Sequence, residues 1–180
     1  MDNNLRLRDK VAIVTGAGSS GPGLGNGKAM ATLFARHGAK VLLADLHKQR
    51  AEETLSIIES EGGSAATIAV DVTEEDGCAR MVQKSMDLYG RLDILVNNVG
   101  ISKRGSVLDV TQEEWDKIMA VNVKSMVLTS QKAIPIMTAS GGGSIINIAS
   151  SAGLRAHRST PYSTSKAAVI GLTFSMAADH

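Results

Sequence analysis

Tyr162 and Lys166 are a pair whose residue types and spacing could transfer a proton. Four residues apart in a helix, they would lie on one face, one turn from each other. A phenol has a reference pKa of about 10, so it is a poor base at neutral pH unless a nearby cation favours the phenolate. Lowering that pKa by roughly three units takes about 4 kcal/mol, to which a lysine ammonium contributes. The pair therefore indicates acid–base chemistry.

A glycine-rich stretch indicates a second kind of chemistry, the binding of a pyrophosphate. Residues 15–27 read TGAGSSGPGLGNG and lie between a short apolar run and an amphipathic stretch. Glycines allow backbone amides to approach the phosphates, whose charge is also stabilised by the positive end of a helix. Asp45, at the end of the next apolar run, can accept hydrogen bonds from ribose hydroxyls and would repel a 2′-phosphate. The sequence therefore predicts a site that prefers NAD to NADP.

The elements that must position these residues follow from the alternation of apolar runs with amphipathic stretches. Five runs lack the polar–apolar alternation of half-exposed strands, as expected for strands covered on both faces. They span residues 11–14, 41–44, 66–70, 94–96 and 144–148. The pattern predicts an α/β fold, a doubly wound parallel sheet of the Rossmann type with strand order 3-2-1-4-5.

Local signals place the helices between these strands. Met30, Leu33 and Phe34 share one helical face, which we expect to cover the sheet. Thr111 followed by Glu114 predicts a capping box, and therefore a helix that begins at this point. Pro161 suits a first helical position, so the helix that carries Tyr162 should begin near it.

These motifs resemble those of the short-chain dehydrogenases. The glycine loop resembles the Thr-Gly-x-x-x-Gly-x-Gly fingerprint, with Gly16 first and the last two glycines at Gly25 and Gly27, or alternatively at Gly21 and Gly23. The segments 97–100 and 143–153 and the Tyr-x-x-x-Lys pair resemble other family motifs. The resemblance runs from about residue 10 to the end of the chain, and it implies a family role for each matching residue.

The resemblance implies four catalytic residues, namely Asn122, Ser150, Tyr162 and Lys166. Asn122 would hold a proton-relay water, and Ser150, for which Ser151 is a possible substitute, would orient the substrate oxygen. Residues 71–72 would flank the adenine, and Lys166 would also bind the nicotinamide ribose. The implied cofactor-binding residues are Gly16, Gly25, Gly27, Asp45, Asp71, Val72, Asn98, Gly100, Tyr162 and Lys166.

The implied function is hydride transfer between NAD and a secondary alcohol or ketone, with the tyrosine as acid and base. An alternative from another class is a non-catalytic NAD-binding or interaction protein. This is because the chain ends where family members continue with further strands and a substrate loop. A sugar-nucleotide epimerase is a weaker alternative, because its glycine spacing differs. Substrate identity would be encoded in the part beyond residue 180.

Composition and net charge argue against several classes of binding partner and cellular compartment. The formal net charge is +1, with both signs mixed along the chain, so we expect neither nucleic acid nor a membrane surface as a partner. The one cysteine, Cys78, fits a reducing compartment, and the first ten residues lack an apolar signal, so we expect a cytoplasmic protein. The four histidines form no convincing metal cluster, and we expect no metal.

The sequence also predicts the domain organisation and the assembly of the chain. We interpret residues 1–9 as an N-terminal leader and residues 10–180 as a single dinucleotide-binding catalytic domain, incomplete at its C-terminus. The family resemblance implies a homodimer or homotetramer, formed through the helices expected at residues 111–138 and 160–178. The partner of the site itself would be a small-molecule alcohol or ketone.

Overall fold

The structure is a computed structural model that describes residues 5–21, 23–155 and 157–180. The first four residues of the expected leader therefore lie outside the described part. The chain forms two compact units. The first, here called the sheet unit, comprises Met1–Asn98 and Leu128–Ile146, and the second, the helical unit, comprises Val99–Val127 and Asn147–His180.

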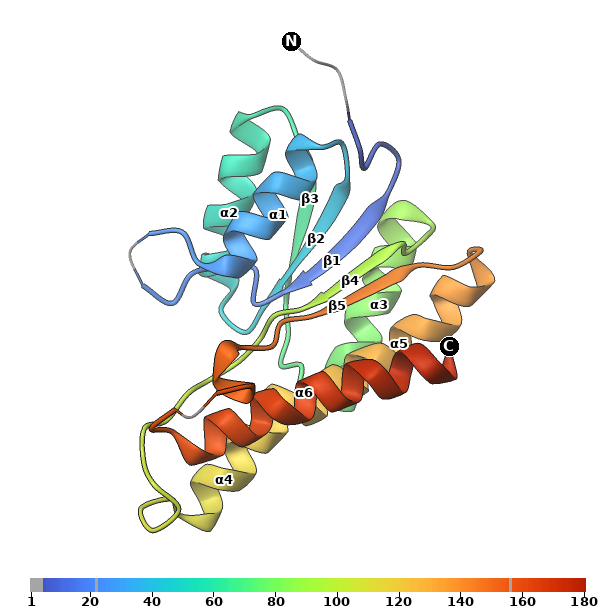
Figure 1. The fold of residues 1–180 in the computed structure, drawn as a ribbon. Coiled ribbons are helices and arrows are strands. Elements are labelled where there is room, and N and C mark those ends of the chain that lie inside the picture. Colours follow the sequence, from blue (N-terminus) through green and yellow to red (C-terminus); the bar gives the residue numbers. More distant parts are fainter. Residues whose placement is uncertain (1–4, 22, 156) are drawn as a thin grey trace. The chain divides into compact units, whose positions relative to one another are not determined.

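Five parallel strands form one sheet in the order β3-β2-β1-β4-β5, which confirms the predicted topology (Figure 1). In register, Ala12 of β1 lies opposite Val41 of β2 and Ile94 of β4. The strand bounds are β1 Val11–Thr15, β2 Lys40–Asp45, β3 Ser64–Ala69, β4 Ile94–Asn97 and β5 Ser144–Asn147.

Burial differs between the middle and the ends of this sheet. Every residue of β1 is buried, as are all residues of β2 after Lys40, so these strands are covered on both faces as predicted. The residues of β3 are only partly buried, and β5 alternates between exposed and half-buried positions. The expectation of coverage on both faces is therefore wrong for β3 and β5, which form the two ends of the strand order.

Three helices of the sheet unit connect its strands: α1 Asn26–Arg36, α2 Lys48–Ser60 and α3 Glu75–Tyr89. Right-handed crossovers place α1 and α2 on one face of the sheet and α3 on the other. The predicted inner face of α1 is wrong, because Leu33 is 50% exposed. The buried residues of α1 are mostly small or polar, Gly27, Lys28, Ala31, Thr32 and Ala35. Small residues at these positions let the helix backbone approach the strands closely.

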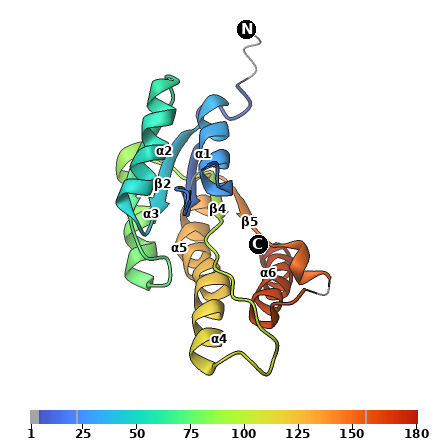
Figure 2. The ribbon, with the colours of Figure 1, turned by 90° about the vertical axis from the view of Figure 1, so that its left-hand side faces the viewer.

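The helical unit contains α4 Gln112–Met119, a π-helical turn at Ala120–Lys124, the beginning of α5 Ser125–Ala139, a 3₁₀ turn at Ser151–Gly153, and α6 Thr160–Asp179. Figure 2 shows α4 continuing through the π-helical turn into α5. The predicted capping box is confirmed, because Thr111 accepts from the Glu114 amide and the Glu114 carboxylate accepts from the Thr111 amide. Helix α6 begins near Pro161 as predicted, but Pro161 is its second residue and not its first.

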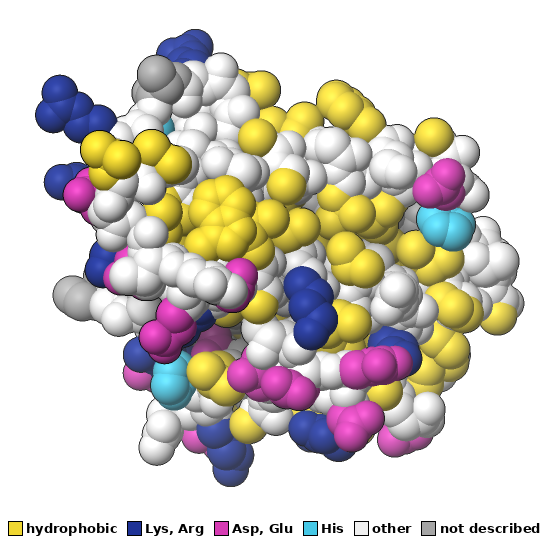
Figure 3. Space-filling model, turned by 90° about the horizontal axis from the view of Figure 1, so that it is seen from below, with side chains coloured by type: hydrophobic (Ala, Val, Ile, Leu, Met, Phe, Trp, Pro, Cys, Tyr) yellow, Lys and Arg dark blue, Asp and Glu magenta, His cyan; other side chains and the backbone are white. Residues whose placement is uncertain are grey.

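Helix α6 has an unusually apolar surface. No charged residue lies between Lys166 and Asp179, and Phe174 is 71% exposed. Figure 3 shows a face of the molecule on which hydrophobic side chains are gathered. Within the described ranges, no helix combines the length and the apolar character that crossing a membrane requires.

Candidate functional site

The N-terminus of α1 lies directly against the end of β1. A Cβ atom on Gly27 would lie 1.9 Å from the Gly16 carbonyl oxygen and 2.8 Å from Asn98 Nδ2, so only glycine fits. Asn98 Nδ2 donates to the carbonyl oxygens of Thr15 and Gly16 at 3.0 and 3.1 Å. The Asn98 side-chain amide thus connects the end of β4 to the glycine loop through the loop's backbone carbonyls.

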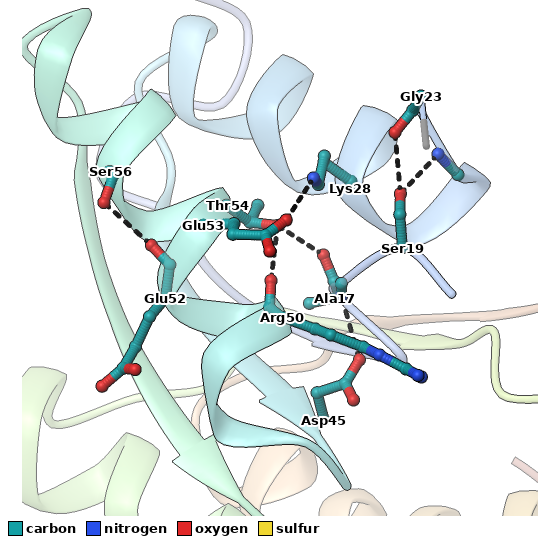
Figure 4. Close-up of polar contacts among 12 residues, drawn as sticks. Ala17, Ser19, Gly23, Lys28, Asp45, Arg50, Glu52, Glu53, Thr54 and Ser56 are labelled. Atoms are coloured by element: carbon teal, nitrogen blue, oxygen red, sulfur yellow. Dashed lines mark hydrogen bonds and ion pairs between the residues drawn. The ribbon is translucent and has the colours of Figure 1, made fainter. Parts of the chain in front are cut away.

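The rest of the loop distinguishes the two glycine registers. Gly25 occupies the N-cap of α1, and its amide donates to Ser19 Oγ at 2.8 Å. Ser19 Oγ donates to the Gly23 carbonyl at 3.1 Å, which closes the loop on itself (Figure 4). A Cβ atom on Gly21 or Gly23 would meet nothing within 4 Å. The close backbone approach that a pyrophosphate loop requires therefore occurs at the register of Gly25 and Gly27.

Asp45 fastens the loop to the start of α2. The residue is 9% exposed, Oδ2 accepts from the Gly18 amide at 3.0 Å, and Oδ1 accepts from the His47 amide at 2.9 Å. A Cβ atom on Gly18 would lie 2.3 Å from Cβ of Arg50, so the loop also packs closely on α2. A carboxylate has about four acceptor positions, so these two bonds leave capacity for ribose hydroxyls.

Two contacts join the glycine loop and α1 to α2. Thr54 Oγ1 donates to the Ala17 carbonyl at 2.8 Å, and Lys28 Nζ lies 3.2 Å from Glu53 Oε2 (Figure 4). The Lys28 side chain is 9% exposed although it lies in the first turn of α1, where no acidic residue stands. Glu53 thus balances the charge of Lys28, and the first turn of α1 presents its backbone amides without an acidic side chain among them, as an anion site requires.

Asp71 and Val72 follow β3, at the carboxyl end of that strand. Asp71 is exposed, and its Oδ1 accepts from the amide and the hydroxyl of Thr73 at 2.8 and 2.7 Å. Val72 is 6% exposed, and its carbonyl accepts from Cys78 Sγ at 3.3 Å. These bonds hold the turn together, with the Asp71 side chain at its surface.

Tyr162 and Lys166 lie together on α6, as their spacing predicts. Lys166 Nζ is 5.9 Å from the centroid of the Tyr162 ring and donates to the Ile148 carbonyl at 2.7 Å. Lys166 is 3% exposed, and its burial lowers the pKa of its ammonium. The Lys166 ammonium is therefore held in place by the Ile148 carbonyl at a buried site beside the Tyr162 ring.

Asn122 braces the segment that follows β4. Its side chain is fully buried within the π-helical turn, Oδ1 accepts from the Ile101 amide at 2.8 Å, and Nδ2 donates to the Ile101 carbonyl at 2.9 Å. Nδ2 also donates to Ser165 Oγ at 2.9 Å, which donates to the Tyr162 carbonyl at 2.7 Å. The amide thus connects the Ile101 backbone to the first turns of α6. Its role toward a relay water stays a prediction.

Ser150 and Ser151 occupy different positions at the 3₁₀ turn. Ser150 is half-buried at the N-cap, where its Oγ accepts from the Ala152 amide at 3.1 Å, while Ser151 is exposed. A Cβ atom on Gly153 would lie 2.7 Å from the Lys166 backbone, so this turn packs tightly on α6. An accepting hydroxyl still carries its own O–H. Ser150 therefore has the better-defined position of the two and retains a donor.

A sequence model described as short chain dehydrogenase matches residues 10–180. The chain belongs to this family. Its members are oxidoreductases, and the parallel sheet in the order 3-2-1-4-5 is that of their Rossmann-fold structures.

Relatives and solved structures of short-chain dehydrogenases agree with this assignment. An uncharacterised oxidoreductase of Thermotoga maritima is 44% identical over 98% of this chain and 68% of its own length. A 3-oxoacyl-[acyl-carrier-protein] reductase of the same organism is 36% identical over 94% of this chain and 67% of its own length. The chain thus spans about two thirds of the relatives that it matches.

Two solved structures illustrate the fold of the family. A putative short-chain dehydrogenase/reductase from Burkholderia xenovorans is similar with a TM-score of 0.94 and 38% identity, over 97% of this chain and 70% of that one. A 7α-hydroxysteroid dehydrogenase complexed with NADH and 7-oxo glycochenodeoxycholic acid has a TM-score of 0.91 and 34% identity, over 99% of this chain and 68% of that one.

Several residues that hold the candidate residues of each unit in place were not found by sequence reasoning. Ser165 links Asn122 to Tyr162, Gly18 makes room for α2, and Gly153 makes room for α6. Ser165 lies three residues after Tyr162, so helical spacing could have suggested a bond to that residue's carbonyl. For the two glycines, the sequence contains no signal that indicates which segment of the backbone packs against them.

Proposed function

We propose that this chain carries the cofactor-binding and proton-transferring residues of an NAD-dependent dehydrogenase, which interconverts a secondary alcohol and its ketone. The observation that carries the proposal is the buried Lys166, held against the Tyr162 ring in a unit braced by Asn122. A buried cation beside a phenol has a clear use in stabilising phenolate. The family supports the same reaction class without specifying the substrate.

The glycine loop fits a dinucleotide. The Gly27 position admits no side chain, and the first turn of α1 contains no acidic residue. The loop amides and Gly16, Gly25 and Gly27 would hold the pyrophosphate, with Asn98 and Gly100 beyond β4 and residues 71–72 at the adenine. Asp45 would accept from the ribose hydroxyls, which favours NAD over NADP. When bound, the nicotinamide would accept the hydride in oxidation and donate it in reduction.

The protein groups would handle the proton. In oxidation, the Tyr162 phenolate would take the proton of the substrate hydroxyl, and in reduction the phenol would return it to the carbonyl oxygen. Lys166 has three N–H donors, of which Ile148 accepts one, so the others would be available to hold the nicotinamide ribose. The Ser150 hydroxyl would donate to the substrate oxygen as negative charge develops there.

The assembly and the location belong to the same proposal. The apolar surface of α6 supports a homodimer or homotetramer, and the single buried thiol of Cys78 supports a reducing, cytoplasmic compartment. We also propose that residues 10–180 form one catalytic domain. The related 7α-hydroxysteroid dehydrogenase is complexed with NADH, which supports NAD as the cofactor.

Tyr162→Phe tests the proposed chemistry, because it removes the phenol oxygen and keeps the ring. We expect kcat for secondary alcohols to fall by about 100-fold or more, while the Kd for NAD stays within about twofold. Turnover would be followed as NADH absorbance and NAD binding by calorimetry. Tyr89→Phe, at the end of α3, is the matched control. Turnover that survives Tyr162→Phe would contradict the mechanism, and wild-type protein that binds NAD without turnover would favour the non-catalytic alternative.

A further inference from the structure

Ser159 stands at the N-cap of α6, three residues before Tyr162, but it does not act as a cap. An N-cap serine normally accepts a hydrogen bond from the amide of the second or third helical residue. Here the second residue is Pro161, which has no N–H, and Ser159 makes no side-chain cap bond. Its hydroxyl donates instead to the Lys103 carbonyl, and the residue is 2% exposed.

A second bond joins the same two segments. The Thr160 amide donates to the Gly105 carbonyl at 3.0 Å, and Gly105 and Ser159 form an isolated parallel bridge. The segment after β4 therefore accepts from both the first amide of α6 and the Ser159 hydroxyl. Lys103 also reaches α4, where its Nζ lies 2.6 Å from Glu114 Oε1.

The other end of this segment lies against the proposed catalytic residues. A Cβ atom on Gly100 would lie 3.3 Å from Lys166 Nζ and 3.5 Å from Asn122 Oδ1. The Ile101 backbone is held by Asn122 through both its amide and its carbonyl. The segment 100–105 thus runs from Lys166 to the beginning of α6, with one fastening at each end.

We propose that Ser159 is a positioning residue, which clamps the segment 100–105 to the first turn of α6 and so holds Tyr162 in place relative to Lys166 and Asn122. Its hydroxyl acts as a donor to Lys103 and not as an acceptor from α6. The consequence for turnover rests on the proposed dehydrogenase function. The clamp itself is a property of the helical unit and can be measured without turnover.

Three substitutions separate a clamp from a cap. Ser159→Asp supplies an excellent cap acceptor but no donor, Ser159→Ala supplies neither, and Ser159→Thr keeps the donor. If Ser159 clamps, amide hydrogen exchange at Thr160 should accelerate roughly ten- to hundred-fold in the Ala and Asp variants and stay near wild type in the Thr variant. Exchange at Ile101, held by Asn122, should change less. Ser175→Ala, which removes an exposed hydroxyl farther along the same helix, is the control.

Kinetics supply the second readout. In the Ala and Asp variants we expect kcat to fall about tenfold with the KM for NAD unchanged, and the Thr variant to recover most of it. Unchanged Thr160 exchange in Ser159→Ala, or an Asp variant that exchanges as slowly as wild type, would overturn the clamp.

Two further results remain decisive. If Ser159→Ala does not fold, Ser159→Cys, a weaker donor of similar size, replaces it, and unchanged exchange at Thr160 would again overturn the clamp. Wild-type protein without turnover on any alcohol would overturn the proposed function, whereas the exchange data would still decide the role of Ser159.

Discussion

At the scale of single residues, several polar side chains that were expected to bind a ligand form hydrogen bonds to the protein backbone. Asp45 accepts from the Gly18 and His47 amides, and Asn122 holds both backbone groups of Ile101. A substitution at such a residue changes a proposed ligand contact and the position of a loop together. Binding and turnover therefore need to be measured separately.

Asp45→Asn illustrates this double role. We expect NAD to bind about tenfold more weakly, because both the ribose contact and the Gly18 tether lose their charge. The preference in binding affinity for NAD over NADP should become smaller but should not reverse, because the displaced loop weakens the binding of either dinucleotide. Fluorescence titration with both cofactors measures this, with exposed Asp87→Asn on α3 as the control. Tighter binding of NADP than of NAD by the wild-type protein would contradict our interpretation of Asp45.

At the scale of elements, sequence placed the strands within one or two residues and found the capping box, because buried runs and local caps leave local signals. It gave the wrong inner face for α1, because apolar content points to Leu33 while Gly27 decides how the helix approaches β1. At the site, the Tyr162 and Lys166 pair was predictable from helical spacing. The Ser159 bond was not, because its partner lies 56 residues earlier in the chain.

Gly27→Ala tests the close approach of α1. The added methyl would collide with the Gly16 carbonyl, so α1 must move outward, and we expect a loss of about 2 kcal/mol in the free energy of unfolding together with at least tenfold weaker NAD binding. Gly21→Ala, where a Cβ atom meets nothing within 4 Å, should change neither quantity appreciably. Urea denaturation and calorimetry give the two numbers. Equal effects of the two substitutions would contradict the close approach of α1 at Gly27.

At the scale of the whole chain, Asp93 connects the N-terminal ends of β1 and β4, because it directly precedes β4 and accepts from the Val11 amide at the start of β1. Asp93 is 5% exposed. Burial alone would raise the pKa of this carboxyl, but hydrogen bonds from Arg91, the Val11 amide and Lys10 outweigh it and lower the pKa. A carboxyl with a lowered folded-state pKa stabilises the protein above its unfolded pKa of about 3.9 and loses that contribution as pH falls through the lower folded value.

Asp93→Asn should therefore lower the free energy of unfolding at pH 7 by about 1–3 kcal/mol. The difference from wild type should begin to shrink below about pH 4, where the carboxyl of the unfolded chain becomes protonated, and should be lost as the pH falls through the lower folded-state pKa of Asp93. Urea denaturation at a series of pH values measures this, with Asp116→Asn on the exposed face of α4 as the control. A difference that stays constant down to pH 2 would mean that Asp93 contributes through its shape and not through its charge.

The π-helical turn at Ala120–Lys124 also changes how positions along this chain correspond to those in other helices. Such a turn contains one residue more than an α-helical turn, and each residue of an α-helix rotates the chain by about 100°. Residues before and after it therefore do not share a common helical phase, and Asn122 stands where the phase changes. Deletion of one residue within the turn would restore an ordinary α-helical turn and displace Asn122, whereas deletion of one residue from α4 after Glu114 would rotate Glu114 by about 100° relative to the beginning of α5. Insertions and deletions in this stretch are thus constrained by rotation and not by length.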